Sequence, residues 1–305
     1  MEHKHPEPTG VLLINKPAGL TSHDVVGRIR RLYGTRRVGH TGTLDPMATG
    51  VLVLLLGRAA KAAEYLSVHD KCYVATLRLG ITTDTEDTTG EILTTCADLP
   101  AATRVLEAAS AYCGRYRQTP PMYSALKVNG QKLLDLARRG IEIEREAREV
   151  TVHKLTVTPT EQPACYTLTV ACSAGTYIRT LCADIGRDLG CGGAMAALCR
   201  TKTGDFALDD CYTLEALEQM DAAAREACLL PTERLFDDLT PVCLPPFFEK
   251  LARSGCEIYQ SKIKTAHPVG ARVRLCDERG SFFAIGEVRT YEGGTAIKAV
   301  KTFVL

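Results

Sequence analysis

The chain has 305 residues, a length that allows one large domain or two unequal ones. Hydrophobic residues make up 45% and charged residues 24%, and no apolar run reaches about 18 residues, so the composition is that of an ordinary globular protein without a membrane span. The formal net charge is only +1, which by itself favours no polyanionic partner, and the first ten residues lack the apolar centre of a secretory signal.

Charge is distributed unevenly along the chain. From Pro241 onward there are 10 Lys or Arg against 6 Asp or Glu, a net charge of +4, so the preceding part carries −3. Residues 11–40 hold six basic residues against Asp24 alone. Such local patches suit a polyanion bound at one face, and the alternative is a solvated helix face.

Thirteen cysteines are present. Their number is odd, they are scattered singly, and no Cys-x-x-Cys pair occurs. We therefore expect small buried side chains in a reducing cytoplasm rather than a disulfide framework or a zinc site.

The first expected elements are a strand over residues 11–14 and a turn over residues 15–19. Thr21 or Ser22 then caps a helix that continues to about Tyr33, because apolar side chains recur there on one stripe.

The stretch from Gly39 to Gly50 reads GHTGTLDPMATG and runs directly into the apolar residues 51–56. Its glycines and proline predict a tight ordered loop, and the apolar run predicts a buried strand that anchors it. The loop holds one carboxylate, Asp45. Residue types alone leave three alternatives for this loop: a structural turn, a phosphate-binding loop, or a rigid loop that presents a reactive acid. The phosphate loop is disfavoured because no Gly-Lys-Ser/Thr follows and the loop enters a strand.

The segment from Gly39 to Leu52 closely resembles the catalytic motif of the TruB family of tRNA pseudouridine synthases, whose aspartate corresponds to Asp45. The resemblance spans nearly the whole chain. It implies an α+β fold with a mixed, mostly antiparallel central sheet flanked by helices, plus a small C-terminal β pseudo-barrel of the PUA type. It also implies a catalytic domain over residues 1–236 and a PUA-like RNA-binding domain over residues 237–305, with Lys16 supporting the catalytic loop from beneath.

A helix is expected over residues 58–67 and an alternating strand over residues 71–79. Tyr73 on this strand is, by residue type, an ordinary core aromatic. By resemblance it matches the tyrosine that stacks on the target uracil, and stacking of an extruded base is worth about 1–3 kcal/mol.

Residues 80–90 are acidic and Thr-rich, which indicates a loop. A helix is expected over residues 101–113, an extended segment over residues 116–123 because of its proline pair, and a short helix over residues 131–139 that ends at Gly140.

Residues 124–149 resemble the mobile insertion, or thumb, with which the family clamps the RNA arm. Its basic side chains are the candidate RNA-binding residues Lys127, Lys132, Arg138 and Arg139. The alternative is an ordinary charged surface loop, because acidic residues balance these cations.

Alternating residues 150–158 and 165–173 predict a hairpin of two core strands, and a helix follows. If the start of that helix is still extended, Tyr177 and Arg179 project from the same face. The resemblance implies that Arg179 pairs with Asp45 and that Tyr177 contacts the base or ribose. Residue type alone would place this arginine at the surface.

A further strand is expected over residues 194–201, where Leu198 matches the leucine that forms the floor under the base in this family. Thr213 is expected to cap a helix over residues 214–220, and four prolines indicate a linker over residues 231–246. The elements expected beyond it are a helix at 244–255 and short strands at 269–273 and 282–288.

The conversion of uridine to pseudouridine breaks a C–N glycosidic bond and joins C5 of the base to the ribose, with no net gain of atoms and no redox step. No cofactor and no metal are therefore expected, and the chain has no fingerprint for either. The reaction needs a carboxylate near C1′ or C6 of the flipped nucleotide, and a guanidinium beside it opposes the rise in the pKa of Asp45 that burial causes. Attack on C1′, attack on C6 and proton abstraction from C2′ all stay open.

The resemblance implies an RNA stem-loop as partner, namely the T-arm of tRNA, with the target uridine at conventional position 55. Extrusion of a base costs least from an already strained loop. His40 either contacts the extruded nucleotide or is a structural histidine. We expect a cytoplasmic monomer that needs neither a membrane nor a protein partner. The alternatives are a guide-RNA-dependent synthase of the dyskerin type and a non-catalytic tRNA-binding or tRNA-folding module.

Overall fold

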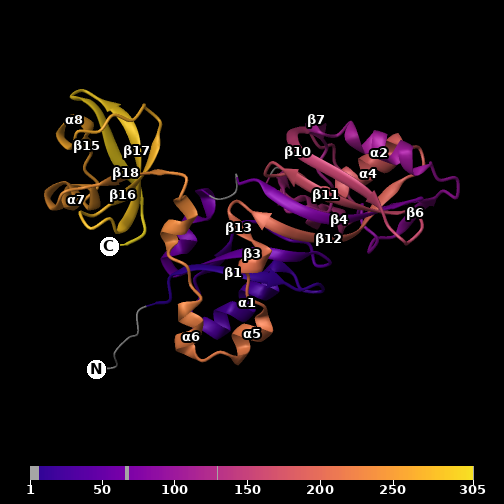
Figure 1. Cartoon of the computed structure of the whole chain (residues 1–305), viewed down its shortest axis with the longest axis horizontal. Coiled ribbons are helices and arrows are strands. Elements are labelled where there is room, and N and C mark those ends of the chain that lie inside the picture. The colour runs from indigo at the N-terminus through magenta and orange to yellow at the C-terminus, as the bar shows by residue number, and fades with distance from the viewer. Residues whose placement is uncertain (1–6, 66–68, 129, 305) are drawn as a thin grey trace.

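A nine-stranded sheet forms the centre of the molecule in a computed structural model that describes residues 7–65, 69–128 and 130–304 (Figure 1). Its strands are β1 (Gly10–Lys16), β2 (Val38–His40), β3 (Thr49–Leu56), β4 (Lys71–Leu79), β7 (Gly114–Gln118), β10 (Arg148–Pro159), β11 (Cys165–Cys172), β12 (Gly193–Thr203) and β13 (Phe206–Ala207). The order is β1-β3-β12-β4-β11-β10-β7, with β2 on β3 and β13 on β12. Because β3 and β12 pair in parallel and the other neighbours antiparallel, the expected mixed, mostly antiparallel sheet is confirmed.

Two groups of helices cover this sheet (Figure 1). They are α1 (Ser22–Tyr33), α5 (Leu214–Gln219) and α6 (Ala222–Ala227) beside β1 and β2, and α2 (Ala102–Ser110) and α4 (Ile178–Asp188) beside β4, β10 and β12. The short 3₁₀ helix η2 (Leu208–Asp210) lies between β13 and α5. The start of α1 is set by a capping box in which Thr21 and Asp24 bond each other's backbone N–H, and its end by Gly34 at φ 63°.

A second sheet forms the C-terminal lobe, drawn in yellow and orange at the left of Figure 1. It contains β14 (Thr240–Cys243), β15 (Ile258–Tyr259), β16 (Arg272–Cys276), β17 (Phe282–Tyr291) and β18 (Gly294–Thr302), in the order β14-β16-β17-β18-β15, with helices α7 (Pro246–Arg253) and α8 (Gln260–Ile263). This lobe has an apolar core of its own, and it confirms the small C-terminal β domain.

The two lobes share a second apolar core. Phe236 lies in the 3₁₀ helix η3 (Thr232–Phe236), and its ring centroid is 5.7 Å from that of Phe282 and 5.5 Å from that of Phe303. Side chains of β1 and β3, among them Leu13 and Val53, belong to the same cluster. The C-terminal lobe is therefore packed directly onto one face of the central sheet, at its β1–β3 end.

The thumb region consists of small elements with a core of their own. These elements are β8 (Lys127–Val128), β9 (Gln131–Lys132) and α3 (Leu133–Ala137), and the buried side chains are Met122, Leu133 and Leu136. The helix is shorter than the expected 131–139, because its first two residues pair as a strand.

The helix expected at 58–67 is observed over Gly57–Tyr65 as a 3₁₀ helix (η1), and the last two residues of the expected segment lie outside the described ones. The buried Ala59 and Ala62 have the three-residue spacing of this helix type. Two other expectations are wrong in part. The expected loop 80–90 contains β5 (Ile81–Thr83), which pairs with β6 (Ile92–Thr95). The expected linker after Pro231 contains η3, the buried Phe236 and β14, so it is part of the folded structure.

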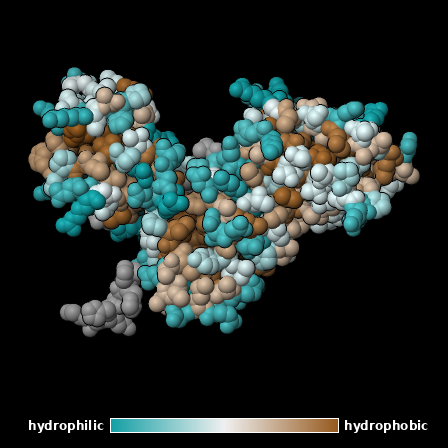
Figure 2. Space-filling view, viewed as in Figure 1, coloured by the Kyte–Doolittle hydropathy of each residue, from teal (hydrophilic) through white to brown (hydrophobic). Residues whose placement is uncertain are grey.

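On the face shown in Figure 2, hydrophobic residues form separate small patches between hydrophilic ones. No helix within the described residues has the length and apolar character needed to cross a membrane.

Candidate functional site

Asp45 lies in the loop between β2 and β3, and its neighbours on both sides are fixed. The Ser22 Oγ atom donates to the carbonyl of Leu44 at 3.1 Å and accepts from its N–H at 2.9 Å. The Lys16 Nζ atom donates to the carbonyl of Pro46 at 3.3 Å. The backbone that presents Asp45 is therefore tied to α1 and to the end of β1.

Lys16 is completely buried and donates two more hydrogen bonds, to the carbonyls of Pro17 at 2.8 Å and Leu20 at 2.6 Å. Burial lowers its pKa to about 8, and the nearby Asp45 carboxylate opposes that shift. The lysine thus supports the loop from beneath and places a cation near its carboxylate.

Arg179 in the first turn of α4 holds Asp45 with two nitrogens. Its Nε lies 3.0 Å from Oδ2 and its Nη2 donates to Oδ1 at 3.3 Å. The arginine side chain is 6% exposed, whereas that of Asp45 is 34% exposed. One edge of the carboxylate is thus bound in a planar pair, and the group is still reachable from solvent.

The same guanidinium binds three further groups. It donates to the carbonyl of Thr85 at 3.0 Å and to that of Tyr123 at 2.8 Å, and its Nη1 lies 3.6 Å from Oδ2 of the buried Asp87. Arg179 therefore connects Asp45 to the loop after β5 and to the base of the thumb.

Opposing influences set the protonation of Asp45. Burial raises its pKa, the Arg179 guanidinium lowers it, the Asp87 carboxylate raises it, and Lys16 lowers it; the net result is a raised pKa. The pocket thus disfavours the charge, and the two cations limit that effect.

Two tyrosines lie within the electrostatic reach of Asp45. Tyr73 is buried on β4, and Tyr177 is the last extended residue before α4. Burial raises the pKa of both phenols, and the Asp45 carboxylate raises both further. Leu198 is buried on β12, opposite Ala75 in the sheet register and hence near Tyr73 on the adjacent strand.

His40 lies at the end of β2 and is half-buried. Its Nδ1 atom is buried and has no hydrogen-bond partner among the described residues. Burial lowers the pKa of the imidazole, and His23 and Arg200 lower it further.

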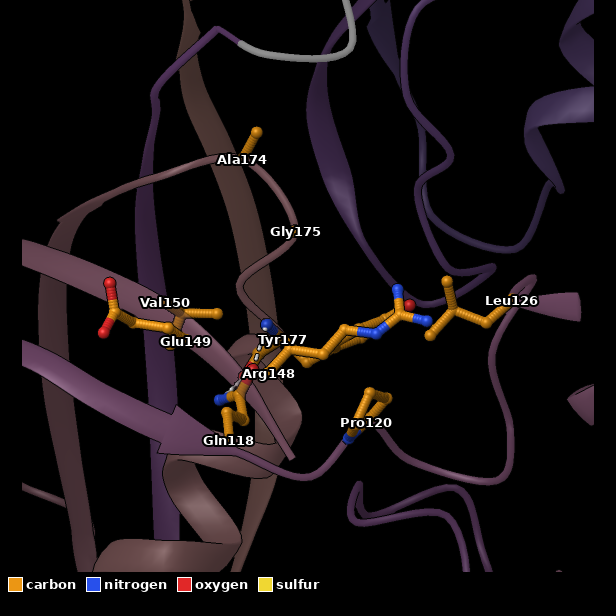
Figure 3. Close-up of a pocket in the computed structure, with 9 residues that line it drawn as sticks. All are labelled: Gln118, Pro120, Leu126, Arg148, Glu149, Val150, Ala174, Gly175 and Tyr177. Carbon is orange, nitrogen blue, oxygen red and sulfur yellow. Dashed lines mark hydrogen bonds between the residues drawn. The ribbon is translucent and has the colours of Figure 1, made fainter. Parts of the chain in front are cut away.

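A cavity of about 200 Å³ lies beside Tyr177 (Figure 3). The side-chain amide of Gln118 donates to the Tyr177 carbonyl at 3.0 Å and accepts from its N–H at 2.8 Å, which fixes this backbone. In Figure 3 the Arg148 side chain extends towards Leu126, and the Glu149 carboxylate points the other way. The cavity thus has an arginine on its wall and opens next to the candidate base-binding tyrosine.

The candidate RNA-binding residues lie on the thumb, in other segments than the Asp45 loop. Lys132, Arg138 and Arg139 are exposed on the thumb, and the side chain of Lys127 lies outside the described part of the structure. The link between the thumb and the site is the Tyr123 carbonyl bound by the guanidinium of α4.

Sequence reasoning missed Asp87 and Arg200. Asp87 belongs to the Thr-rich segment expected to be a loop, and nothing in its residue type indicates a buried acid. Arg200 is 2% exposed in the middle of β12, so the available signal was a charged residue within an expected core strand. The condition that the segment is still extended at Arg179 does not hold, because α4 begins at Ile178, yet the helical turn directs the arginine side chain to Asp45.

The side chains that could ligate a metal ion are dispersed. The thirteen cysteines are free, and within the described residues no group of three or more His, Cys, Asp or Glu is arranged to hold a metal ion.

Curated relatives match the chain over most of its length. A protein of Alkaliphilus oremlandii (strain OhILAs) named tRNA pseudouridine synthase B is 43% identical over 282 residues, which are 92% of this chain and 93% of the relative. A Bacillus subtilis (strain 168) protein of the same name is 42% identical over 285 residues, with 90% and 92% covered.

Solved structures share the fold. A crystal structure of a Cbf5-Nop10-Gar1 complex contains a chain that superposes with a TM-score of 0.70 at 24% identity, covering 97% of this chain and 85% of that one. Residues 30–178 match the family model described as TruB family pseudouridylate synthase (N terminal domain), and residues 179–237 match that of the tRNA pseudouridylate synthase B C-terminal domain. Together with the relatives above, these matches mean that the chain belongs to the TruB family of pseudouridylate synthases.

Proposed function

We propose that this protein converts uridine to pseudouridine in tRNA, at position 55 in the T-loop, and that it acts alone as a cytoplasmic monomer without a cofactor. The observation that carries the proposal is the two-nitrogen pair between Arg179 and the partly exposed Asp45. The name shared by the relatives, tRNA pseudouridine synthase B, supports tRNA as the substrate.

Asp45 is the catalytic carboxylate in this proposal. The C1′–N1 bond of the target uridine breaks, the base rotates, a C1′–C5 bond forms, and the proton of C5 is lost while N1 gains one. A carboxylate held beside the ribose can act as nucleophile at C1′, as nucleophile at C6, or as base toward C2′. Arg179 favours its ionised form and orients it in a pocket that raises its pKa.

The surrounding side chains bind the extruded uridine. Tyr73 stacks on the base and takes part in catalysis, Tyr177 contacts the base or ribose, and Leu198 forms the floor. The burial of Tyr73 and Leu198 on adjacent strands and the half-buried position of Tyr177 support these roles, since an extruded base needs an apolar, π-rich pocket. His40 contacts the nucleotide through the imidazole that carries an unpartnered nitrogen.

The remaining regions hold the RNA. We assign residues 1–236 to the catalytic domain, residues 237–305 to a PUA-like RNA-binding domain and residues 124–149 to the thumb. The exposed cations of the thumb, Lys132, Arg138 and Arg139, with Lys127, contact phosphates. A secondary role in tRNA folding is compatible with the same grip on the RNA.

The test is release of tritium from an unmodified tRNA transcript labelled at C5 of uridine, with the purified protein and no other component. We expect one tritium per tRNA, because the C1′–C5 bond displaces that hydrogen. Mutation of uridine 55 to cytidine in the transcript is the matched control and should abolish release. Release only in the presence of a guide RNA or partner proteins would contradict stand-alone action, and binding without release would leave a non-catalytic RNA-binding module.

A further inference from the structure

The buried guanidinium of Arg200 is bound by backbone carbonyls rather than by a carboxylate. Its guanidinium donates to three backbone carbonyls, namely those of Val51 at 2.7 Å, Gly42 at 3.1 Å and Thr43 at 3.5 Å. Among the ion pairs of the described residues none includes this guanidinium. Burying an arginine without a carboxylate partner is costly, so its planar set of donors relies for compensation on two carbonyls of the Asp45 loop and one of β3.

The backbone of Arg200 holds the other end of the same loop. β12 pairs in parallel with β3 at this point, with Arg200 opposite Gly50. Gly50 has φ 100°, and a Cβ there would lie 2.2 Å from the Arg200 carbonyl oxygen, so only glycine permits this approach. One residue therefore fixes Gly42 and Thr43 before Asp45, and Gly50 after it.

Arg200 also faces Tyr73. The two residues are opposite each other in the antiparallel pairing of β12 and β4, so their side chains lie on the same face of the sheet. The guanidinium opposes the rise in the pKa of the Tyr73 phenol that burial causes. The Arg200 side chain thus binds the Asp45 loop and interacts with the Tyr73 phenol.

We propose that Arg200 is a positioning residue that sets the placement of the Asp45 loop relative to Tyr73, an inference that rests on the proposed function. It does not touch the reacting atoms. Arg179 orients the carboxylate itself, whereas Arg200 fixes the backbone from which that carboxylate projects. The distance from carboxylate to bound base then depends on both.

The substitution Arg200→Lys tests this, because lysine keeps the positive charge but cannot reach three carbonyls with a rigid fork. We expect the single-turnover rate of tritium release to fall about 10- to 100-fold, the size of effect that a misplacement of about 1 Å produces. The dissociation constant for tRNA should stay within about threefold, because the RNA-facing surface is unchanged. Arg200→Gln, which keeps a donor, is made in parallel in case the lysine variant does not fold.

Arg225→Lys is the matched control. Arg225 on α6 is half-buried, and its guanidinium also donates to carbonyls, those of Met220 at 2.8 and 3.0 Å and Leu32 at 2.7 Å, away from the loop. The two Arg200 variants and Arg225→Lys should all lower the melting temperature, but only the Arg200 variants should lower the single-turnover rate of tritium release.

The outcomes separate this inference from the proposed function. An active wild-type protein together with a wild-type rate in both Arg200 variants would overturn the positioning role alone. A loss of rate matched by an equal loss of tRNA affinity, or by an equal loss of rate in Arg225→Lys, would also overturn it. A wild-type protein that releases no tritium would overturn the proposed function and this inference together.

Discussion

The Nη1 atom of Arg179 lies 3.6 Å from the Oδ2 atom of the buried Asp87, so two carboxylates share the guanidinium that binds Asp45. Asp87 is itself held by the Thr85 hydroxyl at 2.9 Å and the Thr89 N–H at 2.9 Å. The Asp87 charge therefore disfavours ionisation of Asp45. The same carboxylate also binds the arginine that lies between the two acids.

Asp87→Asn should move the acidic limb of the pH–rate profile to lower pH. The Asp87 charge raises the pKa of Asp45, so its removal lowers that pKa and extends the pH range in which Asp45 is ionised. The plateau rate should fall about 10- to 100-fold, because Arg179 loses one anchor. Single-turnover tritium release from acid to neutral pH measures both effects, and Asp84→Asn in the same loop is the control. An acidic limb that moves upward would contradict the assigned charge pattern.

Arg179→Lys should lower the single-turnover rate by about 10²- to 10³-fold while tRNA affinity changes little. Lysine keeps the charge, but it cannot bind both oxygens of Asp45 and also reach the Thr85 and Tyr123 carbonyls. Arg187→Lys on the same helix serves as the control and should retain the wild-type rate, because this exposed arginine pairs with Asp184 rather than with Asp45. Retained activity in Arg179→Lys would mean that charge alone suffices and that the geometry of the pair does not matter.

Asp45→Asn should lose activity by about 10⁴-fold or more yet gain stability at neutral pH. Folding raises the pKa of Asp45 above its usual value of 3.8, so its contribution to stability is favourable below that value and is lost as pH rises through the folded-state pKa. Asparagine is uncharged, so the variant lacks the unfavourable contribution that the buried ionised carboxylate makes at neutral pH. The difference in the free energy of unfolding between variant and wild type should shrink as pH is lowered towards about 4. Denaturant unfolding at several pH values measures this difference in stability, and Asp205→Asn on the surface is the control. An Asp45→Asn variant less stable than wild type at pH 7 would contradict the predicted gain in stability.

Local patterns in the sequence were sufficient for much of the fold. The strand Lys71–Leu79 is observed with the bounds that its alternation predicts, and Thr21 caps α1 with the help of Asp24. Both depend on neighbours within a few residues, where periodicity and capping chemistry act. The resemblance placed Asp45 and Arg179 together although 134 residues separate them.

The parts that could not be predicted depend on distant backbone groups. Arg200 binds carbonyls of the Asp45 loop and of β3 about 150 residues away in the chain, and a carbonyl has no signature in the sequence because every residue carries one. The buried Asp87 lies beside the guanidinium of Arg179, a distant partner that no pattern in its own segment reports. The apolar residues around Phe236 were hidden among prolines, and their burial depends on the C-terminal sheet.

The stability of the wild-type protein should rise relative to Lys16→Met as pH increases from about 8 to 10.5. Folding lowers the pKa of Lys16 from 10.5 to about 8, so this contribution is fully present above 10.5 and is lost as pH falls through 8. The difference in the free energy of unfolding should change by about 3 kcal/mol over this range. Denaturant titrations of both proteins at pH 7.5 and 10.5 measure this change. A difference in the free energy of unfolding that does not vary with pH would show that burial does not disfavour the charged form of Lys16.

Replacement of the thumb cations Lys132, Arg138 and Arg139 by glutamine should weaken tRNA binding without slowing the chemical step. Removal of one phosphate-binding cation should reduce the slope of log binding constant against log salt concentration by about 0.7–0.9, so removal of three should change it by about 2. Binding titrations at several salt concentrations measure the slope, and tritium release with enzyme in saturating excess measures the rate. The variant Arg104→Gln/Lys154→Gln/Arg187→Gln removes the same charge from exposed positions outside the thumb and should leave the slope nearly unchanged. Equal slopes in the two triple variants would mean that the thumb binds no phosphates of its own, and a slower single-turnover rate at saturation would mean that these residues also act at the catalytic site.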